Sequence, residues 1–194
     1  MTQEQKQKIQ SLAEAEIRHS FQFIKNQTDK EGKDLVAYYF FLVDDFFAAN
    51  NAAVTQQDIE AWKKTDDYDP EYDGLLNAIW SGVCELYEGD FIPVSETSEN
   101  WLDSQPALYK EAYLLVEGLD DYDKYNKIRA DFEQCIIDAL KKCDEEGVFG
   151  NRKENGLLLF AFYSDDYDEN GENSLLYRSA EALNDKKGFE NIIK

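Results

Sequence analysis

The chain is 194 residues long and strongly acidic, with 41 Asp and Glu against 20 Lys and Arg and a formal net charge of −21. Hydrophobic residues make up 43% and aromatic residues 14%, which excludes a disordered chain and suffices for a core without a metal or disulfide. So acidic a surface repels phosphates, which argues against binding nucleic acid and against docking on an anionic membrane. We expect a single domain over residues 1–194.

The acid is concentrated in the middle of the chain. Residues 1–33 carry a net charge of +1, residues 34–123 a net charge of −18 and residues 124–194 a net charge of −4. A partner drawn to this charge would be basic.

The N-terminal part of the chain predicts a helix followed by two strands. Residues 3–26 place apolar side chains at helical spacing, and Gly32 lies beyond the expected end. The continuous apolar run at 35–43 is typical of a strand buried on both faces. Residues 46–49 are expected to return as a second strand.

The middle of the chain predicts short elements and acidic loops. Thr55, followed by Asp58, resembles a capping box and opens a short helix that ends near Trp62. Residues 65–74 hold a proline, a glycine and several acids, so we expect a loop there. Residues 75–80 fit either a strand or a helix, and we interpret them as a strand.

The clearest helix spans residues 122–146, which present one apolar face and are followed by Gly147, a suitable C′ residue. A helix at 107–117, a strand at 156–164 and a helix at 174–183 complete the pattern. This order predicts an α+β fold with a small mixed or antiparallel sheet, packed with the N-terminal helix, the long helix and a C-terminal helix.

The sequence lacks the motifs of common catalytic sites. His19 is the one histidine, which excludes metal sites that need two. No GxSxG, GxxxxGK[ST] or GxGxxG motif is present. We therefore name no catalytic residue and no cofactor. The alternative is an enzyme that uses carboxylates or a divalent metal on an unidentified substrate.

Cysteine usage and the polar N-terminus set the expected compartment. Cys84, Cys135 and Cys143 are too few and too widely spaced for a disulfide framework. The N-terminus lacks an apolar signal core, and no apolar run is long enough to cross a bilayer. These features predict reduced thiols in a cytoplasmic protein with no membrane contact.

One acidic loop offers a metal candidate. Asp166, Asp168 and Asn170, followed by Gly171, match the first half of an EF-hand calcium loop. The second half fails, because position 12 is Tyr177 where a bidentate Glu is needed. A polar turn between strand and helix is the preferred interpretation.

The tetrapeptide Asp-Asp-Tyr-Asp occurs twice in the acidic middle of the chain and once after it. Tyrosine contributes anchoring area at an interface while acids steer association, so these segments predict binding of a basic protein. The alternative is a solvated face that keeps the protein soluble. The candidate binding residues are Asp66, Asp67, Tyr68, Asp69, Tyr72, Asp120, Asp121, Tyr122 and Asp123.

The last third of the chain carries a longer motif. A helix ending ALKKCDEEGVFG at 139–150 leads into the strand LLLFAFYSDD at 157–166, and the next helix contains SAEALN at 179–184. This resembles a bacterial family described as domain of unknown function 4303, with the largest departures at 85–120. The resemblance implies a single α+β domain and no established activity. Small acidic bacterial proteins of this kind often look like immunity proteins of toxin systems, so by analogy we expect a protein that neutralises a basic toxin.

Overall fold

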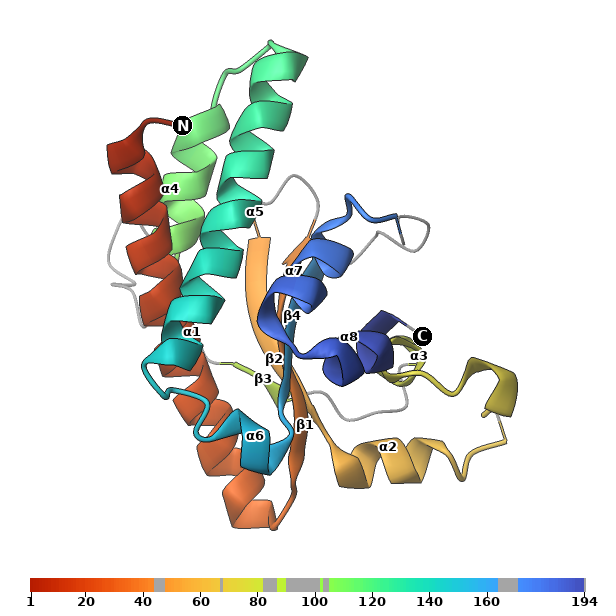
Figure 1. Ribbon diagram of the computed structural model, residues 1–194. Coiled ribbons are helices and arrows are strands. Elements are labelled where there is room, and N and C mark those ends of the chain that lie inside the picture. Colours follow the sequence, from red (N-terminus) through yellow and green to blue (C-terminus); the bar gives the residue numbers. More distant parts are fainter. Residues whose placement is uncertain are drawn as a thin grey trace.

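A mixed four-stranded sheet forms the centre of the protein (Figure 1). The computed structural model describes residues 1–43, 48–66, 68–81, 87–89, 102, 105–163 and 171–193. The strands are β1 (Leu35–Val43), β2 (Ala48–Thr55), β3 (Tyr87–Glu88) and β4 (Leu158–Tyr163), in the spatial order β3-β2-β1-β4. β2 is antiparallel to both of its neighbours, whereas β1 and β4 are parallel. The predicted α+β fold is confirmed, and its sheet is the mixed form.

The inner strand β1 is buried on both faces, as its continuous apolar sequence predicts. Because side chains alternate along a strand, Tyr38 and Phe40 face one core while Ala37 and Tyr39 face the other. None of the four is more than 1% exposed. Tyr39 stacks on Phe160 of β4, with ring centroids 5.3 Å apart.

Three helices cover one face of the sheet: α1 (Gln3–Glu31), α4 (Ala107–Val116) and α5 (Tyr122–Glu145) (Figure 1). α1 and α5 lie side by side and bury their apolar faces against each other and the sheet. They confirm the helices predicted at 3–26 and 122–146, and α4 confirms the one at 107–117. The core includes Ile9, Ala13, Ile17, Phe21, Ile24, Phe132, Ile136, Leu140 and Cys143.

Shorter helices cover the opposite face: α2 (Gln56–Trp62), α3 (Leu75–Trp80) and α8 (Lys186–Ile193). The 3₁₀ turn η1 (Pro70–Tyr72) lies between α2 and α3 in the chain, and its Pro70 and Glu71 are exposed. Trp62, Ile79 and Ile192 contribute to the second core on this side. The two cores enclose the sheet between helical layers (Figure 1).

The remaining helices lie at the β4 side of the sheet. α6 (Arg152–Asn155) precedes β4, and α7 (Leu175–Leu183) follows it and packs along its length. Ser179 of α7 bonds the edge of the strand directly: its Oγ accepts from the N–H of Ala161 at 2.8 Å and donates to the Ala161 carbonyl at 2.9 Å. α7 therefore closes an edge that would otherwise expose unpaired backbone groups.

The helix ends follow their sequence signals. Thr55 accepts a hydrogen bond from the N–H of Asp58 at the start of α2, which is one of the two bonds of the predicted capping box. The Asp58 carboxylate accepts from the Thr55 hydroxyl and pairs with Lys33. After α5, Gly147 adopts φ 77°, a left-handed conformation that favours glycine. Gly32 plays the same part after α1, with φ 67°.

The strand predicted at residues 75–80 is wrong, because these residues form helix α3. Helical bonds link the Ala78 N–H to the Gly74 carbonyl at 3.0 Å and the Ser81 N–H to the Asn77 carbonyl at 2.9 Å. The segment is almost wholly apolar and fits both periods. Packing of Ala78 and Ile79 against a sheet face, rather than pairing with a strand edge, selects the helix.

The second strand was predicted four residues long at 46–49, and β2 instead runs from Ala48 to Thr55. Its extension passes through Asn50 and Asn51, which lack the apolar character that identifies a strand. Asn51 is nevertheless 3% exposed, and its side chain accepts a hydrogen bond from Tyr38 at 2.8 Å. The predicted start at 46 lies outside the described residues.

Candidate functional site

The second Asp-Asp-Tyr-Asp copy lies at the start of α5, at the end of the α4–α5 hairpin (Figure 1). Asp121 caps the helix by accepting from the N–H of Lys124 at 3.0 Å. Asp120 and Asp123 are exposed, and Tyr122 is 75% exposed. Within the described part of the chain, none of these three carboxylates forms an ion pair. The hairpin thus presents an aromatic ring among three exposed carboxylates.

The first copy is arranged differently. Tyr68 is partly buried and packs edge-on against Trp62 of α2, with ring centroids 5.1 Å apart. Asp73, a few residues on, forms an ion pair with Lys63 at 2.7 Å. Tyr68 is therefore already used in packing within the chain.

The acids of that first copy are exposed. Asp66 lies in the turn after α2, and Asp69 caps η1 by accepting from the Glu71 N–H at 2.9 Å. Asp67 and the side chain of Tyr72 lie outside the described residues.

The structure does not bring the two acidic segments together. The η1 region and the α4–α5 hairpin lie at opposite ends of the molecule (Figure 1). Among the described residues, no group of three or more His, Cys, Asp or Glu side chains is arranged to hold a metal ion. The candidate ligands Asp166, Asp168 and Asn170 lie outside that part of the chain.

The two described cysteines are free and buried. Burial raises the pKa of both Cys135 and Cys143 to about 11. Each thiol approaches a carbonyl of α1, with Cys135 Sγ 3.6 Å from the Lys6 oxygen. Both stay protonated at neutral pH and pack the α1–α5 interface. Cys84 lies outside the described residues.

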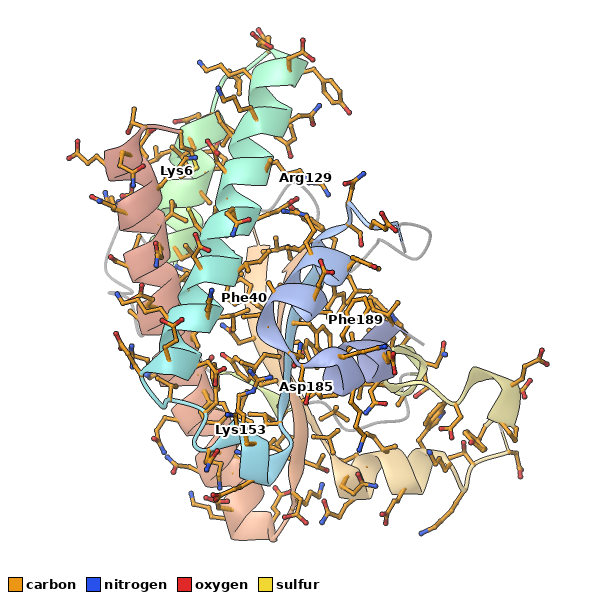
Figure 2. All side chains as sticks on the ribbon, viewed as in Figure 1. Lys6, Phe40, Arg129, Lys153, Asp185 and Phe189 are labelled. Atoms are coloured by element: carbon orange, nitrogen blue, oxygen red, sulfur yellow. The ribbon has the colours of Figure 1, made fainter. Side chains whose placement is uncertain are left out.

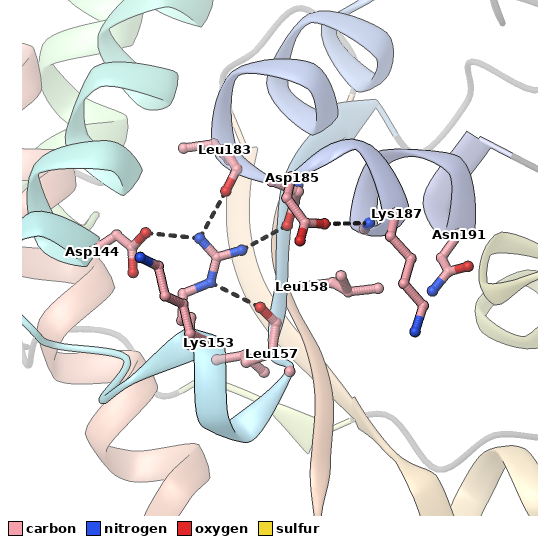
Figure 3. Close-up of a pocket in the computed structure, with 12 residues that line it drawn as sticks. Asp144, Lys153, Leu157, Leu158, Leu183, Asp185, Lys187 and Asn191 are labelled. Atoms are coloured by element: carbon pink, nitrogen blue, oxygen red, sulfur yellow. Dashed lines mark hydrogen bonds and ion pairs between the residues drawn. The ribbon is translucent and has the colours of Figure 1, made fainter.

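A hollow of about 460 Å³ opens between α6, the start of β4 and α8 (Figure 3). Its central group is the guanidinium of Arg152. Nε donates to the Leu157 carbonyl at 2.8 Å, Nη1 donates to Asp144 at 2.8 Å and to the Leu183 carbonyl at 2.7 Å, and Nη2 donates to Asn184 at 2.6 Å. All three nitrogens bond the protein itself, so Arg152 ties the end of α5 to the end of α7.

The rim of this hollow carries charges of both signs. Lys153 and Lys187 line it together with Asp144 and Asp185 (Figure 3). Asp185 accepts a hydrogen bond from the Gly188 N–H at 2.8 Å and so holds the first turn of α8. Arg152 and Asp185 are thus both engaged in contacts that hold the fold.

A second polar cluster gathers two of the chain's four arginines around one buried carboxylate. Glu133 of α5 is 7% exposed. Its Oε1 accepts from Arg129 Nε at 3.0 Å and from the Tyr163 hydroxyl at 2.9 Å, and its Oε2 accepts from Arg178. Burial and the nearby Glu133 raise the pKa of Tyr163, so the phenol is neutral and the cluster keeps a net positive charge.

Arg129 holds its guanidinium in a fixed orientation. The group lies over the ring of Tyr163, 4.1 Å from the ring centroid, and Nε also donates to the Tyr163 hydroxyl at 3.1 Å. Its terminal nitrogens, Nη1 and Nη2, have no hydrogen-bond partner among the residues that the structure describes. Figure 2 shows Arg129 on α5, on the side toward the start of α7.

Arg129 lines a small hollow of about 220 Å³ together with Asn126, Asn173 and Ser174. The hollow lies where β4 has ended and α7 begins, at the carboxyl end of a strand that is parallel to β1. In open α/β sheets, ligands bind outside the carboxyl ends of strands. Sequence reasoning missed this cluster. The four-residue spacing of Arg129 and Glu133 was a visible signal, but Tyr163 and Arg178 come from distant parts of the chain.

The chain is similar to one known protein family. Residues 95–185 match the family described as domain of unknown function (DUF4303). No curated protein and no solved structure matches the chain. The resemblance seen in the motif at 139–184 is confirmed to this extent, and the match reaches upstream through residues 95–120.

The matched region contains the whole of the Arg129 cluster. Two residues of the motif at 139–184 have a structural role: Ser179 and Asn184 both form hydrogen bonds with the backbone of β4. Among the helices of the described residues, none has both the length and the apolar character needed to cross a membrane.

Proposed function

We propose that this is a non-enzymatic binding protein whose acidic surface engages a basic protein. The observation that carries the proposal is Tyr122, 75% exposed among Asp120, Asp121 and Asp123 at the end of the α4–α5 hairpin. A tyrosine gives a large, amphipathic contact at low entropic cost, and surrounding carboxylates steer a basic partner toward it.

The way the fold uses its other acids supports this assignment. Two of the buried carboxylates are paired with cations: Glu14 with Lys142 at 2.7 Å, and Asp58 with Lys33 at 3.1 Å. The carboxylates at 120–123 are exposed and form no such pair among the described residues. Apart from the cap that Asp121 forms on α5, no hydrogen bond or ion pair among the described residues engages them, so their outer faces are available to a partner.

Of the two acidic segments, the one at 120–123 is the better anchor. Tyr68 of the other segment already packs against Trp62, and moving it to a partner would forfeit that contact. We therefore place the partner on the α4–α5 hairpin and assign Asp66 and Asp69 to long-range steering.

In its most concrete form, the proposal is a cytoplasmic bacterial immunity protein that neutralises a cationic toxin. Its support is the net charge of −18 over residues 34–123 and the lack of catalytic motifs in the sequence. The similarity to a family without a known activity neither adds to this form nor opposes it.

The test is titration calorimetry against each basic protein encoded beside the gene. We expect one of them to bind, and we expect Y122A to raise the dissociation constant by about thirtyfold and the triple variant D120N/D121N/D123N to raise it by about tenfold. Asparagine preserves the α5 cap at position 121. The matched control, D66N/D69N/E71Q, removes the same charge elsewhere, and its dissociation constant should stay within about threefold of the wild-type value. Equal losses in both triples would refute a localised site, and no binding to any such protein would refute the proposal.

The alternative, a carboxylate or metal-dependent enzyme, makes a different prediction. A bound ion at a hundred times its dissociation constant adds about 2.7 kcal/mol to stability, so Ca²⁺, Mg²⁺ or Mn²⁺ would raise the melting temperature. A rise that persists in D120N/D121N/D123N but disappears in D166N/D168N would favour this alternative.

A further inference from the structure

The geometry points to an oxyanion-binding site at Arg129: we infer that the hollow there takes the carboxylate or phosphate group of a small ligand on the two terminal guanidinium nitrogens. Arg129 offers these donors side by side, in the fork that matches two oxygens of such a group. The inference does not depend on a partner at the acidic α4–α5 hairpin, although Asn126 of the hollow lies only one turn of α5 beyond Tyr122 and Asp123.

The guanidinium is held ready for a ligand rather than consumed by the fold. Its Nε edge bonds Glu133 and Tyr163, and its flat face rests on the Tyr163 ring. Glu133 cannot turn to cover the other edge, because it also holds Tyr163 and Arg178. The outer edge, Nη1 and Nη2, therefore remains open with its orientation fixed. Because the Arg129 side chain is already ordered, binding a ligand there costs little side-chain entropy.

The surroundings of that edge suit a small anion. Asn126, Asn173 and Ser174 line the hollow beside Arg129 and offer neutral polar groups. Glu133 lines it too, and its carboxylate is engaged by Arg129, Tyr163 and Arg178. α7, nine residues long, begins at this point, so its positive end adds to the potential. A volume of about 220 Å³ accommodates a single phosphate or carboxylate group but not a large cofactor.

Arg152 shows what a purely structural arginine looks like in the same chain. All three of its nitrogens bond the protein, and the carbonyl oxygens of Leu157 and Leu183 are among its acceptors. Arg129 differs, because its terminal nitrogens have no acceptor among the described residues. This difference separates a ligand-binding role from an architectural one.

The primary test is NMR of the wild-type protein, which has four arginine Nε–H signals. Inorganic phosphate and acetate are titrated separately at constant ionic strength, with NaCl as the balancing salt. We expect the Arg129 signal to shift saturably with one or both, at a dissociation constant between about 1 and 20 mM. The Arg152 signal should stay in place. The anion that saturates at the lower concentration identifies the ligand group.

Variants locate the binding. R129K keeps the charge but lacks the two-nitrogen fork, and it should weaken binding by about tenfold or more. Because R129K has no Arg129 signal, binding to each variant is followed on the backbone amide signals of Asn173 and Ser174, which line the hollow. The control K187Q removes an exposed cation from the other hollow and should stay within about twofold. The inference is overturned if neither anion gives a saturable shift, if NaCl alone produces the same shift, or if K187Q weakens binding as much as R129K.

Discussion

The side-chain amide of Asn184 pairs with the backbone of Leu159 as a neighbouring strand would. Nδ2 donates to the Leu159 carbonyl at 2.6 Å, and the Leu159 N–H donates to Oδ1 at 3.0 Å. Ser179 does the same for Ala161, two residues along β4. Two side chains of the α7 region thus close the edge of the sheet. Arg152 Nη2 also donates a hydrogen bond to Asn184 Oδ1.

Replacing Asn184 by alanine should destabilise the protein strongly. The change leaves the N–H and carbonyl of Leu159 without partners, and each unsatisfied buried group costs about 1–3 kcal/mol. We expect urea unfolding to show a loss of about 2–4 kcal/mol. N191A, an exposed asparagine on α8, should change stability by less than about 0.5 kcal/mol. Equal stability of the two variants would show that water can replace the amide.

The closure of this edge also explains what the sequence could and could not predict. Periodicity and caps located α1, β1, α5, β4 and α7, because each has a long apolar pattern of its own. The pairing of Ser179 and Asn184 with β4 joins residues 18 and 25 positions away, and no local pattern records such a contact. α8 was not predicted, although Phe189, Ile192 and Ile193 recur at helical spacing and pack against the second core.

Gly89 lies where the β3 segment passes closest to α1. Its N–H donates to the Asn51 carbonyl at 2.6 Å, and a Cβ built there would overlap Ser20 and come 3.2 Å from that carbonyl oxygen. G89A should therefore lower stability by about 1–3 kcal/mol. G171A is the matched control, since nothing lies within 4 Å of a Cβ at Gly171.

A double-mutant cycle checks the mechanism of the Gly89 effect. In the S20G background the overlapping side chain is gone, so G89A should cost less there than in wild type. The measurement is the coupling between the two changes in urea unfolding. Additive effects would mean that Ser20 is not the source of the strain.

The ion pairs of Asp131 predict a pH dependence of stability. Burial by itself would raise the pKa of Asp131, but hydrogen bonds from Lys6 and from the amino group of Met1 outweigh it, and the pKa is lowered. A carboxyl whose pKa is lower in the folded state stabilises the fold above its unfolded pKa of about 3.9, and the benefit is lost as pH falls through the folded pKa.

The measurement is the difference in unfolding free energy between wild type and D131N. We expect it to be constant from pH 7 to about pH 5 and to shrink below about pH 4. K6M removes one of the two cations that pair with Asp131. The difference in unfolding free energy between wild type and K6M should therefore be smaller than that between wild type and D131N, with the same pH dependence. A difference that grows on acidification would contradict the assigned sign.

Salt should stabilise the protein. The net charge of −18 over residues 34–123 produces repulsion in the folded state that monovalent ions screen. We expect NaCl to raise the melting temperature between about 0.02 and 0.3 M. The rise should be smaller in D120N/D121N/D123N, which removes part of the repulsion. A fall in melting temperature would mean that ion pairs such as Lys142–Glu14 dominate the salt response.

The candidate sites differ in how far the sequence could reveal them. The acids and Tyr122 were identifiable from composition, because exposed binding residues need only the right side chains near one another in sequence. The choice between Tyr122 and Tyr68 needed the structure, since only the packing of Trp62 shows that Tyr68 is already engaged. The Arg129 cluster could be identified only from the structure, because Tyr163 and Arg178 are distant from Arg129 and Glu133 in the sequence and come together only on folding.

The final prediction separates steering from anchoring at the α4–α5 hairpin, using the basic partner found by calorimetry. Neutralising Asp120, Asp121 and Asp123 to asparagine should slow association by about tenfold at low salt and change dissociation by less than about threefold. Y122A should do the reverse, because losing a buried aromatic anchor speeds dissociation by about thirtyfold while the steering field remains.

Stopped-flow kinetics at several NaCl concentrations distinguish these effects. The wild-type association rate should fall steeply with salt, and the triple variant should show a shallower dependence because three steering charges are gone. D66N/D69N/E71Q should also flatten the salt dependence of association, but it should leave dissociation unchanged, since Tyr68 stays packed on Trp62. If Y122A alters only association, the ring does not enter the interface, and the acids around it serve solubility instead.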